Sequence, residues 1–105
     1  VLWDTGATNT LISHEVVDAL GLQPKNKALM SSAGSDVESW TYLAHIILPT
    51  GTAELNVQVL LNDNSDYDVV IGMDIINSCD FCYTNKDGKS TFSLCHPAKE
   101  KIILK

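Results

Sequence analysis

The chain of 105 residues is long enough for one domain with a modest hydrophobic core and too short for two lobes. Hydrophobic residues make up 45% and charged residues 19% of it, a balance that excludes a disordered or fibrous protein. A formal net charge of −6, with 7 Lys and Arg in all, excludes a clustered basic surface for nucleic-acid phosphates, and no apolar run approaches the length of a membrane span.

Most of the chain shows the pattern of short β-strands separated by turn residues. Predicted strands lie at Val1–Trp3, Thr10–Ile12, Lys27–Ser32, Val37–Leu48, Ala53–Leu61 and Val69–Ile71. Leu55, Val57 and Val59 alternate with polar residues, whereas the strand at 69–71 is wholly apolar, which is typical of a buried strand. Asn85-Lys86-Asp87-Gly88 predicts the turn of a C-terminal hairpin.

Two short helices complete the pattern. Ser13 is a favourable N-cap and Gly21 a favourable C-terminal stop, so the apolar stripe between them predicts a helix at about 14–20. Asp74 is expected to cap a second helix through Ile75 and Ile76. Together the elements predict a mostly β fold, a compact, closed, barrel-like domain with one or two short helices.

Asp4 is the first candidate for chemistry. It follows an apolar strand and precedes Thr5 and Gly6, so a sharp turn places its carboxylate at a strand end. Gly6 permits a close approach of its backbone amide, and the Thr5 hydroxyl can reach a neighbour. Taken alone, the tripeptide is more often an ordinary turn, because Asp, Thr and Gly all favour turns.

A second stretch changes that balance. Val69-Val70-Ile71-Gly72-Met73-Asp74-Ile75-Ile76 follows downstream, and in order and spacing the two stretches resemble the hallmark pair of the retropepsin-like (retroviral-type) aspartic peptidases. The chain is most similar to retroviral-protease-like domains of bacterial proteins, through Ala19-Leu20-Gly21-Leu22, Tyr42-Leu43 and the segment Thr84–Ser93. The resemblance extends from residue 1 to about residue 97.

The resemblance implies a role for each matching residue. It implies an acid-protease lobe with Asp4 as the catalytic residue and with Thr5 and Gly6 supporting the active-site loop. The structural motif of the family falls on Ile71, Gly72 and Asp74.

Peptide hydrolysis needs one carboxylate that takes a proton from water and another, still protonated, that polarises the carbonyl. Two carboxylates in contact cannot both ionise, so they share a proton. The chain has a single Asp-Thr-Gly, and Asp74 matches a structural position of the family. We therefore predict a homodimer in which each copy contributes Asp4 across a two-fold axis, with a peptide or protein substrate and no cofactor, nucleic-acid or membrane partner.

The hairpin Met30–Tyr42 stands at the flap position of the family, where a cover over the substrate is needed. Ala33, Gly34 and Ser35 lie near its tip, and small residues there let the tip move and its amides reach a peptide backbone. Ala7 is assigned to the same substrate-binding group. An ordinary exposed hairpin turn is the alternative. Trp40, on the returning strand, is interpreted as a packing residue.

The chain departs from the family at two positions. Many retroviral enzymes carry Asp at the position of Thr8 and Arg at that of Met73, and those residues form an ion pair near the dimer interface. Here both are absent, so no buried charge is left unpaired, and pairing must rest on other contacts. The family also has a strand before the active-site strand, whereas this chain opens on Val1, without an initiator Met. We expect residues 1–105 to be a single domain lacking that strand, cut from a longer polypeptide, with 98–105 as a possible tail.

Cys79-Asp80-Phe81-Cys82 is a C-x-x-C pair, and Cys95-His96 follows downstream. Three thiolates and one imidazole could form a zinc site. Neighbouring residues of a strand point to opposite faces, however, so we predict that the four do not converge on a metal and that the thiols are ordinary semi-buried ones. His14 and His45 are interpreted as surface residues without partners.

The leading hypothesis is an acid-favouring aspartic endopeptidase acting on an extended peptide. The first alternative is a catalytically silent retropepsin-fold dimerisation or peptide-binding module, and the second is a zinc-binding structural domain. The intact Asp4-Thr5-Gly6 favours the enzyme, because a module without turnover need not keep the carboxylate. The compartment stays undetermined, with a cytoplasmic location slightly favoured.

Overall fold

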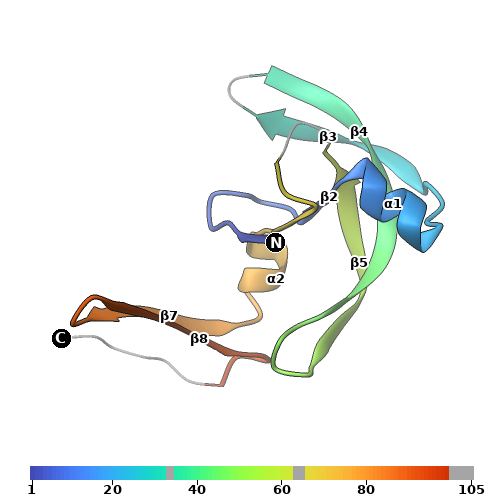
Figure 1. Cartoon of the computed structure of the whole chain (residues 1–105). Coiled ribbons are helices and arrows are strands. Elements are labelled where there is room, and N and C mark those ends of the chain that lie inside the picture. The colour runs from blue at the N-terminus through green and yellow to red at the C-terminus, as the bar shows by residue number, and fades with distance from the viewer. Residues whose placement is uncertain (33–34, 63–65, 100–105) are drawn as a thin grey trace.

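The computed structural model describes residues 1–32, 35–62 and 66–99. Within them the chain forms eight strands and two helices (Figure 1), which are β1 (Leu2–Trp3), β2 (Leu11–Ile12), α1 (His14–Leu20), β3 (Asn26–Ser32), β4 (Ser35–Ile47), β5 (Ala53–Leu61), β6 (Val69–Ile71), α2 (Met73–Ile76), β7 (Asp80–Lys86) and β8 (Lys89–Cys95). The mostly β class and both predicted helices are confirmed.

Six strands form one mixed sheet in the order β1-β6-β2-β5-β4-β3. Strand β6 lies between the two strands that flank the Asp4 turn, parallel to β1 and antiparallel to β2. The pairs Trp3↔Ile71 and Leu11↔Val70 fix this register. A segment more than fifty residues downstream is therefore held between the two arms of the candidate catalytic loop.

Local sequence explains helix α1. Ser13 has extended backbone angles, and its hydroxyl accepts a 3.3 Å hydrogen bond from the Val16 amide, as an N-cap does. Gly21 ends the helix in the left-handed region at φ 62°, where a residue without a Cβ is favoured. The same Ser13 hydroxyl donates to Asp68 at 3.0 Å, which ties the start of the helix to the segment before β6.

Two apolar clusters form the core. Helix α1 contributes Val17 to the first, where it packs with residues of β2, β4 and β5: Ile12, Tyr42 and Val59. Helix α2 contributes to the second, whose buried members are Leu48, Ile71, Ile75 and Ile76. Val69 of β6 packs against both clusters, whereas Ile71 at the other end of the strand belongs to the second.

A β-bulge interrupts the sheet between β4 and β5. Ala44 pairs with Val57 and Ile46 with Glu54, so the register shifts, and Asn56 has a positive φ of 54°. The bulge interrupts the alternation of buried apolar and exposed polar side chains that the sequence predicts along β5. Val59 is fully buried, whereas Leu55 is 66% exposed and Glu54 is half-buried beside His96.

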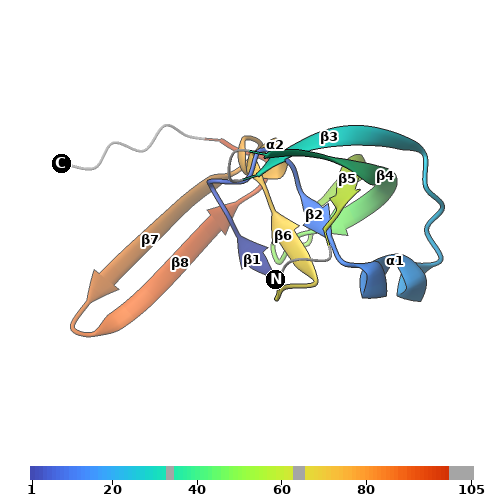
Figure 2. The ribbon, with the colours of Figure 1, turned by 90° about the horizontal axis from the view of Figure 1, so that it is seen from above.

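The expected closed barrel is corrected by the topology of the described strands. The six-stranded sheet is curved but open, with β1 and β3 as its edges, and β7 and β8 form a separate two-stranded sheet that pairs with neither (Figures 1 and 2). Asp87 and Gly88, at φ 53° and 75°, make the tight turn of this hairpin at the predicted place. Within the described part of the chain, no helix is long and apolar enough to cross a membrane.

Candidate active site

Asp4 lies directly after strand β1, where the chain leaves the sheet. Its backbone amide donates to the Ile71 carbonyl at 2.9 Å, which continues the pairing of β1 with β6 by one residue. Its side chain is half-buried, and Oδ1 accepts a 2.9 Å hydrogen bond from the Gly6 amide. The carboxylate is thereby fixed at a strand end by a backbone donor and stays accessible.

Gly6 lies close against the Asp4 side chain. A Cβ at position 6 would lie 3.2 Å from Asp4 Oδ1, tight against the oxygen that the Gly6 amide holds. Thr5, between them, is exposed. Ala7 closes the turn by donating from its amide to the Asp4 carbonyl at 3.2 Å.

Helix α2 holds the far side of the loop through backbone hydrogen bonds. The Met73 amide donates to the Ala7 carbonyl at 2.7 Å, and the Asp74 amide donates to the Thr8 carbonyl at 3.2 Å. Thr8 and Met73, which replace the charged pair of many retroviral enzymes, therefore still lie on contacting segments. Their backbone atoms make the contacts that hold these segments together, and neither bond needs a charge.

Gly72 allows this close approach. A Cβ at position 72 would lie 2.5 Å from the Asn9 carbonyl oxygen, closer than side chains come to backbone, and a tight 3.0 Å from that of Ala7. Gly72 also stands at the N-cap of α2, where we had expected Asp74. Asp74 lies instead in the first turn, and its carboxylate accepts from the Ile75 amide at 2.9 Å.

Thr10 is the residue of this site that sequence reasoning missed. It is completely buried, and its hydroxyl donates to Asp74 Oδ1 at 2.7 Å and accepts from the Gly72 amide at 3.2 Å. The only available signal was a Thr at the start of an otherwise apolar strand. Asp74 is thus a structural residue that ties α2 to the loop of Asp4.

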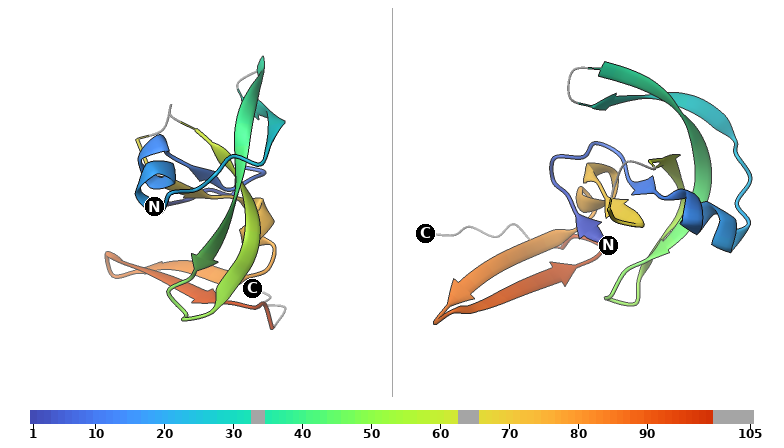
Figure 3. Two further views of the ribbon diagram at one scale, coloured as in Figure 1. Left: turned by 90° about the vertical axis from the view of Figure 1, so that its right-hand side faces the viewer. Right: turned by 45° about the horizontal axis from the view of Figure 1, so that its top comes forward.

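The candidate flap is the outer end of the β3–β4 hairpin. Its strands pair without interruption from Asn26↔Thr41 to Ser32↔Ser35, and the free end extends over the side that carries the loop between β1 and β2 (Figure 3). Ala33 and Gly34, assigned to the tip, lie outside the described residues. Trp40 is 44% exposed and stacks under the Lys27 ammonium group at 4.8 Å, so it packs against its cross-strand neighbour.

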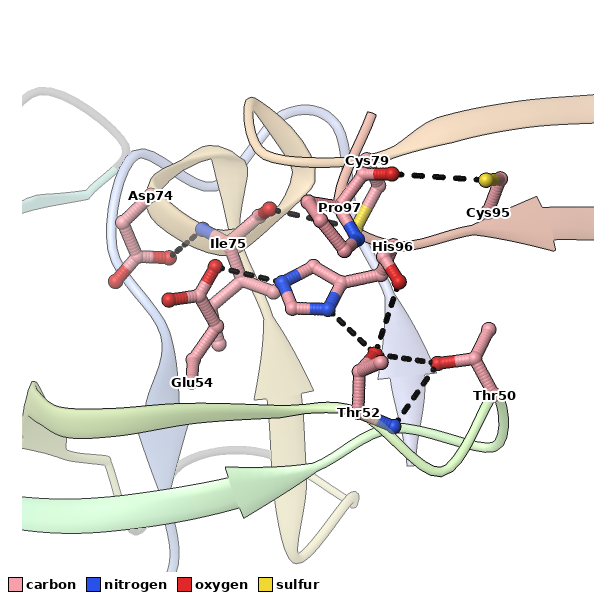
Figure 4. A network of polar contacts seen from close by, with 9 residues as sticks. All are labelled: Thr50, Thr52, Glu54, Asp74, Ile75, Cys79, Cys95, His96 and Pro97. Atoms are coloured by element: carbon pink, nitrogen blue, oxygen red, sulfur yellow. Dashed lines mark hydrogen bonds and ion pairs between the residues drawn. The ribbon is translucent and has the colours of Figure 1, made fainter. Parts of the chain in front are cut away.

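Several residues of the suggested zinc site have other partners. His96 is buried, and its Nε2 lies 2.8 Å from Glu54 Oε1 while its Nδ1 lies 2.6 Å from the Thr52 hydroxyl (Figure 4). All three thiols are free, and Cys79 Sγ donates weakly to the Ile75 carbonyl. Burial is the main cause that raises the pKa of the Cys79 thiol above its ordinary value. Among the described residues no three potential ligands meet.

The other two histidines are exposed, as expected, but they do have partners. His14 Nε2 lies 3.3 Å from Asp18 Oδ2, one helical turn away. His45 Nδ1 accepts a hydrogen bond from the Asn56 amide at 3.0 Å, at the β-bulge. Both contacts serve local structure, and the expectation of histidines without partners was wrong.

Comparison with known families gives a match over most of the chain. Residues 1–78 match the model of the family described as "gag-polyprotein putative aspartyl protease". The chain therefore belongs to this retropepsin-like family, as its two motifs indicated. No curated protein and no solved structure matches the chain significantly.

Proposed function

We propose that this chain is one half of an aspartic endopeptidase whose catalytic dyad consists of Asp4 from each of two identical copies. The observation that carries the proposal is the placement of Asp4. Its carboxylate is at a strand end, held by the Gly6 amide at 2.9 Å and accessible to a partner. Hydrogen bonds fix the loop that carries Asp4 to α2, so the carboxylate is preorganised.

Each part of the loop has a role in this proposal. One Asp4 carboxylate accepts the proton of an attacking water while the protonated Asp4 of the partner donates to the carbonyl oxygen of the substrate. Thr5 is exposed beside Asp4 and would hydrogen-bond across the two-fold axis. The Gly6 amide would support the Asp4 carboxylate of its own chain. Residues 33–35 at the flap tip and Ala7 would contact the bound peptide backbone. Because the dyad must hold one shared proton, cleavage is expected to be favoured in acid.

A digestion of a peptide library by the purified chain tests the proposal. Wild type is expected to cleave, pepstatin is expected to inhibit, and Asp4→Asn is expected to abolish cleavage, because an amide cannot accept the proton of water. Asp18→Asn removes an exposed carboxylate of α1 and serves as the matched control, with activity unchanged. Equal cleavage by Asp4→Asn would refute the aspartic-peptidase function, and peptide binding without cleavage by wild type would favour the catalytically silent module.

A further inference from the structure

His96 fastens the end of the C-terminal hairpin to the six-stranded sheet. It follows β8 directly, and its imidazole reaches β5 and the turn before that strand (Figure 4). Nε2 lies 2.8 Å from Glu54 Oε1, and Nδ1 lies 2.6 Å from the Thr52 hydroxyl. The Thr52 hydroxyl also donates to the His96 carbonyl at 3.1 Å. The contacts of His96 with Thr52 and Glu54, here called the His96 clasp, join segments 44 and 42 residues apart in the chain.

The donors and acceptors of the clasp fit a positively charged imidazole. When both ring nitrogens carry a proton, Nε2 donates to the Glu54 carboxylate and Nδ1 donates to the Thr52 oxygen. The Thr52 hydroxyl then keeps its own proton for the His96 carbonyl. Nε2 carries a proton whenever Glu54 is ionised, because its lone pair would otherwise point at the lone pairs of a carboxylate. The clasp is therefore a hydrogen-bonded ion pair when His96 is charged.

The two members of this pair differ in their access to water. The His96 side chain is 6% exposed, whereas that of Glu54 is 31% exposed. The Glu54 carboxylate can therefore exchange a proton with solvent. The hydrogen bond from His96, with a smaller contribution from Ser78, lowers the pKa of Glu54 below its ordinary value of 4.5. Histidine side chains are positively charged in acid, so a proton on Glu54 leaves a buried cation without its counter-ion, which is strongly destabilising.

Other titratable groups lie near Glu54 on the elements that pack beside it. Cys79 lies between α2 and β7, Asp80 begins β7, and Cys95 ends β8. Burial, and then the negative charges of Glu54 and Asp80, raise the pKa of the Cys79 thiol, with a smaller contribution from Cys95. Of these groups and His96, only His96 can carry a positive charge. The charge of Glu54 therefore has its counter-ion in His96.

The hairpin depends on such attachments, because β7 and β8 pair only with each other among the described residues. A two-stranded hairpin is marginally stable in water unless it packs against something else. The Trp3 ring packs edge-on against Phe81 and Phe92, with centroids 5.5 and 5.4 Å apart. These rings supply an apolar contact, and His96 supplies a polar one. Loss of the polar contact therefore weakens the packing of the rings on Trp3.

We propose that the His96 clasp is an acid-sensitive switch that holds the C-terminal hairpin against the six-stranded sheet while Glu54 is ionised and releases the hairpin when Glu54 takes up a proton. A carboxyl group with a lowered folded pKa contributes stability above its unfolded pKa and loses it as the pH falls through the folded pKa. The hairpin is therefore docked near neutrality and released below about pH 4.5. The sheet and both helices keep their apolar clusters in the released state. The inference does not depend on peptide cleavage.

The fluorescence of Trp3 measures the docking of the hairpin. The reference chain carries Trp40→Phe, which removes the other tryptophan, and Asp4→Asn, which removes self-digestion and a carboxyl group beside Trp3 that would titrate in the same range. As the pH is lowered from about 6 to about 3, the Trp3 emission is expected to shift to longer wavelength below about pH 4.5, because the ring gains water. Far-UV circular dichroism is expected to keep its sheet signal over this step.

Three variants of the reference chain separate the clasp from other effects of acid. Glu54→Gln keeps an acceptor for Nε2 but cannot ionise, so its emission is expected to be shifted already at about pH 5 and to change no further below it. His96→Gln removes the buried cation, so a proton on Glu54 leaves no charge unpaired and the acid step is expected to be absent. Glu38→Gln removes an exposed carboxylate of β4 and is the matched control, with the step of the reference chain unchanged.

Hydrogen exchange of the reference chain checks that the release is local. Below about pH 4.5 the protection of the β7 and β8 amides, corrected for the intrinsic exchange rate, is expected to fall roughly tenfold or more relative to that of the β5 amides. An equal loss of protection in all three strands, or an emission shift that coincides with loss of the circular dichroism signal, would mean global unfolding and overturn the switch. The same acid step in all four chains would overturn it as well, as would a hairpin that stays docked at every pH.

Discussion

The Thr10 hydroxyl lies 2.7 Å from Asp74 Oδ1, and the Thr10 amide lies 3.0 Å from Asp74 Oδ2, so one carboxylate binds both polar groups of a residue 64 positions away. Thr10 is completely buried, and the same hydroxyl also accepts from the Gly72 amide. This pair therefore connects the strand after the candidate catalytic loop to the helix that supports the loop.

Replacing Thr10 by Val is expected to lower the free energy of unfolding by about 2–4 kcal/mol, since the buried Gly72 amide loses its acceptor and Asp74 a donor. Urea unfolding measures the change. Thr91→Val, at an exposed position of β8, is the matched control and is expected to stay within about 0.5 kcal/mol of wild type. Equal stability of the two variants would show that the Thr10–Asp74 pair does not hold the loop.

Gly72 and Gly6 are expected to respond differently to Ala. A Cβ on Gly72 meets the Asn9 backbone at 2.5 Å, so Gly72→Ala is expected to cost about 1–3 kcal/mol of stability or more. A Cβ on Gly6 meets only the end of the Asp4 side chain, which can move, so Gly6→Ala is expected to cost less than about 1 kcal/mol. Under the proposed function Gly6→Ala still lowers peptide cleavage, because it displaces the carboxylate. The opposite order of stabilities would contradict this geometry.

Stability is expected to fall in acid through Glu54. The hydrogen bond from His96 lowers the pKa of Glu54 below its ordinary value of 4.5. A carboxyl group with a lowered folded pKa contributes stability above its unfolded pKa and loses that contribution as the pH falls through the folded pKa. The gap in melting temperature between wild type and Glu54→Gln is therefore expected to be constant near neutrality and to shrink below about pH 4.5. A gap independent of pH would refute this role.

Glu38→Gln provides the control for that series, because Glu38 is exposed on β4. Its melting temperature is expected to follow wild type at every pH. The comparison also separates the acid sensitivity of the fold from the acid preference expected of the proposed dyad, which peptide cleavage measures.

Mixing experiments test the shared dyad. At high dilution, where monomers dominate, activity is expected to rise with the square of the protein concentration. At concentrations where dimers dominate, threefold excess of Asp4→Asn is expected to reduce wild-type activity to about one quarter, because random pairing places most wild-type chains in heterodimers. The same excess of Asp18→Asn is expected to cause no such loss of activity. Activity unaffected by Asp4→Asn would mean that a single chain is catalytic.

Sequence alone determined the elements whose boundaries depend on interactions between residues close together in the chain. Ser13 and Gly21 delimit the helix predicted at about 14–20, because an N-cap hydroxyl and a residue tolerant of positive φ act within a few residues. The apolar strand at 69–71 and the Asp87-Gly88 turn were equally local signals. The two motifs also sufficed to recognise the family, since their order and spacing are carried by the chain itself.

Only the tertiary structure decided how these elements meet. Strand β6 enters between β1 and β2, Thr10 meets Asp74, and His96 turns toward Glu54. Leu55 faces solvent because a bulge shifts the register of β5 against β4. Strand pairing depends on the register between distant segments, and a shift of one residue exchanges the faces of a strand. Each of these contacts joins residues far apart in the chain, so no local pattern could specify it.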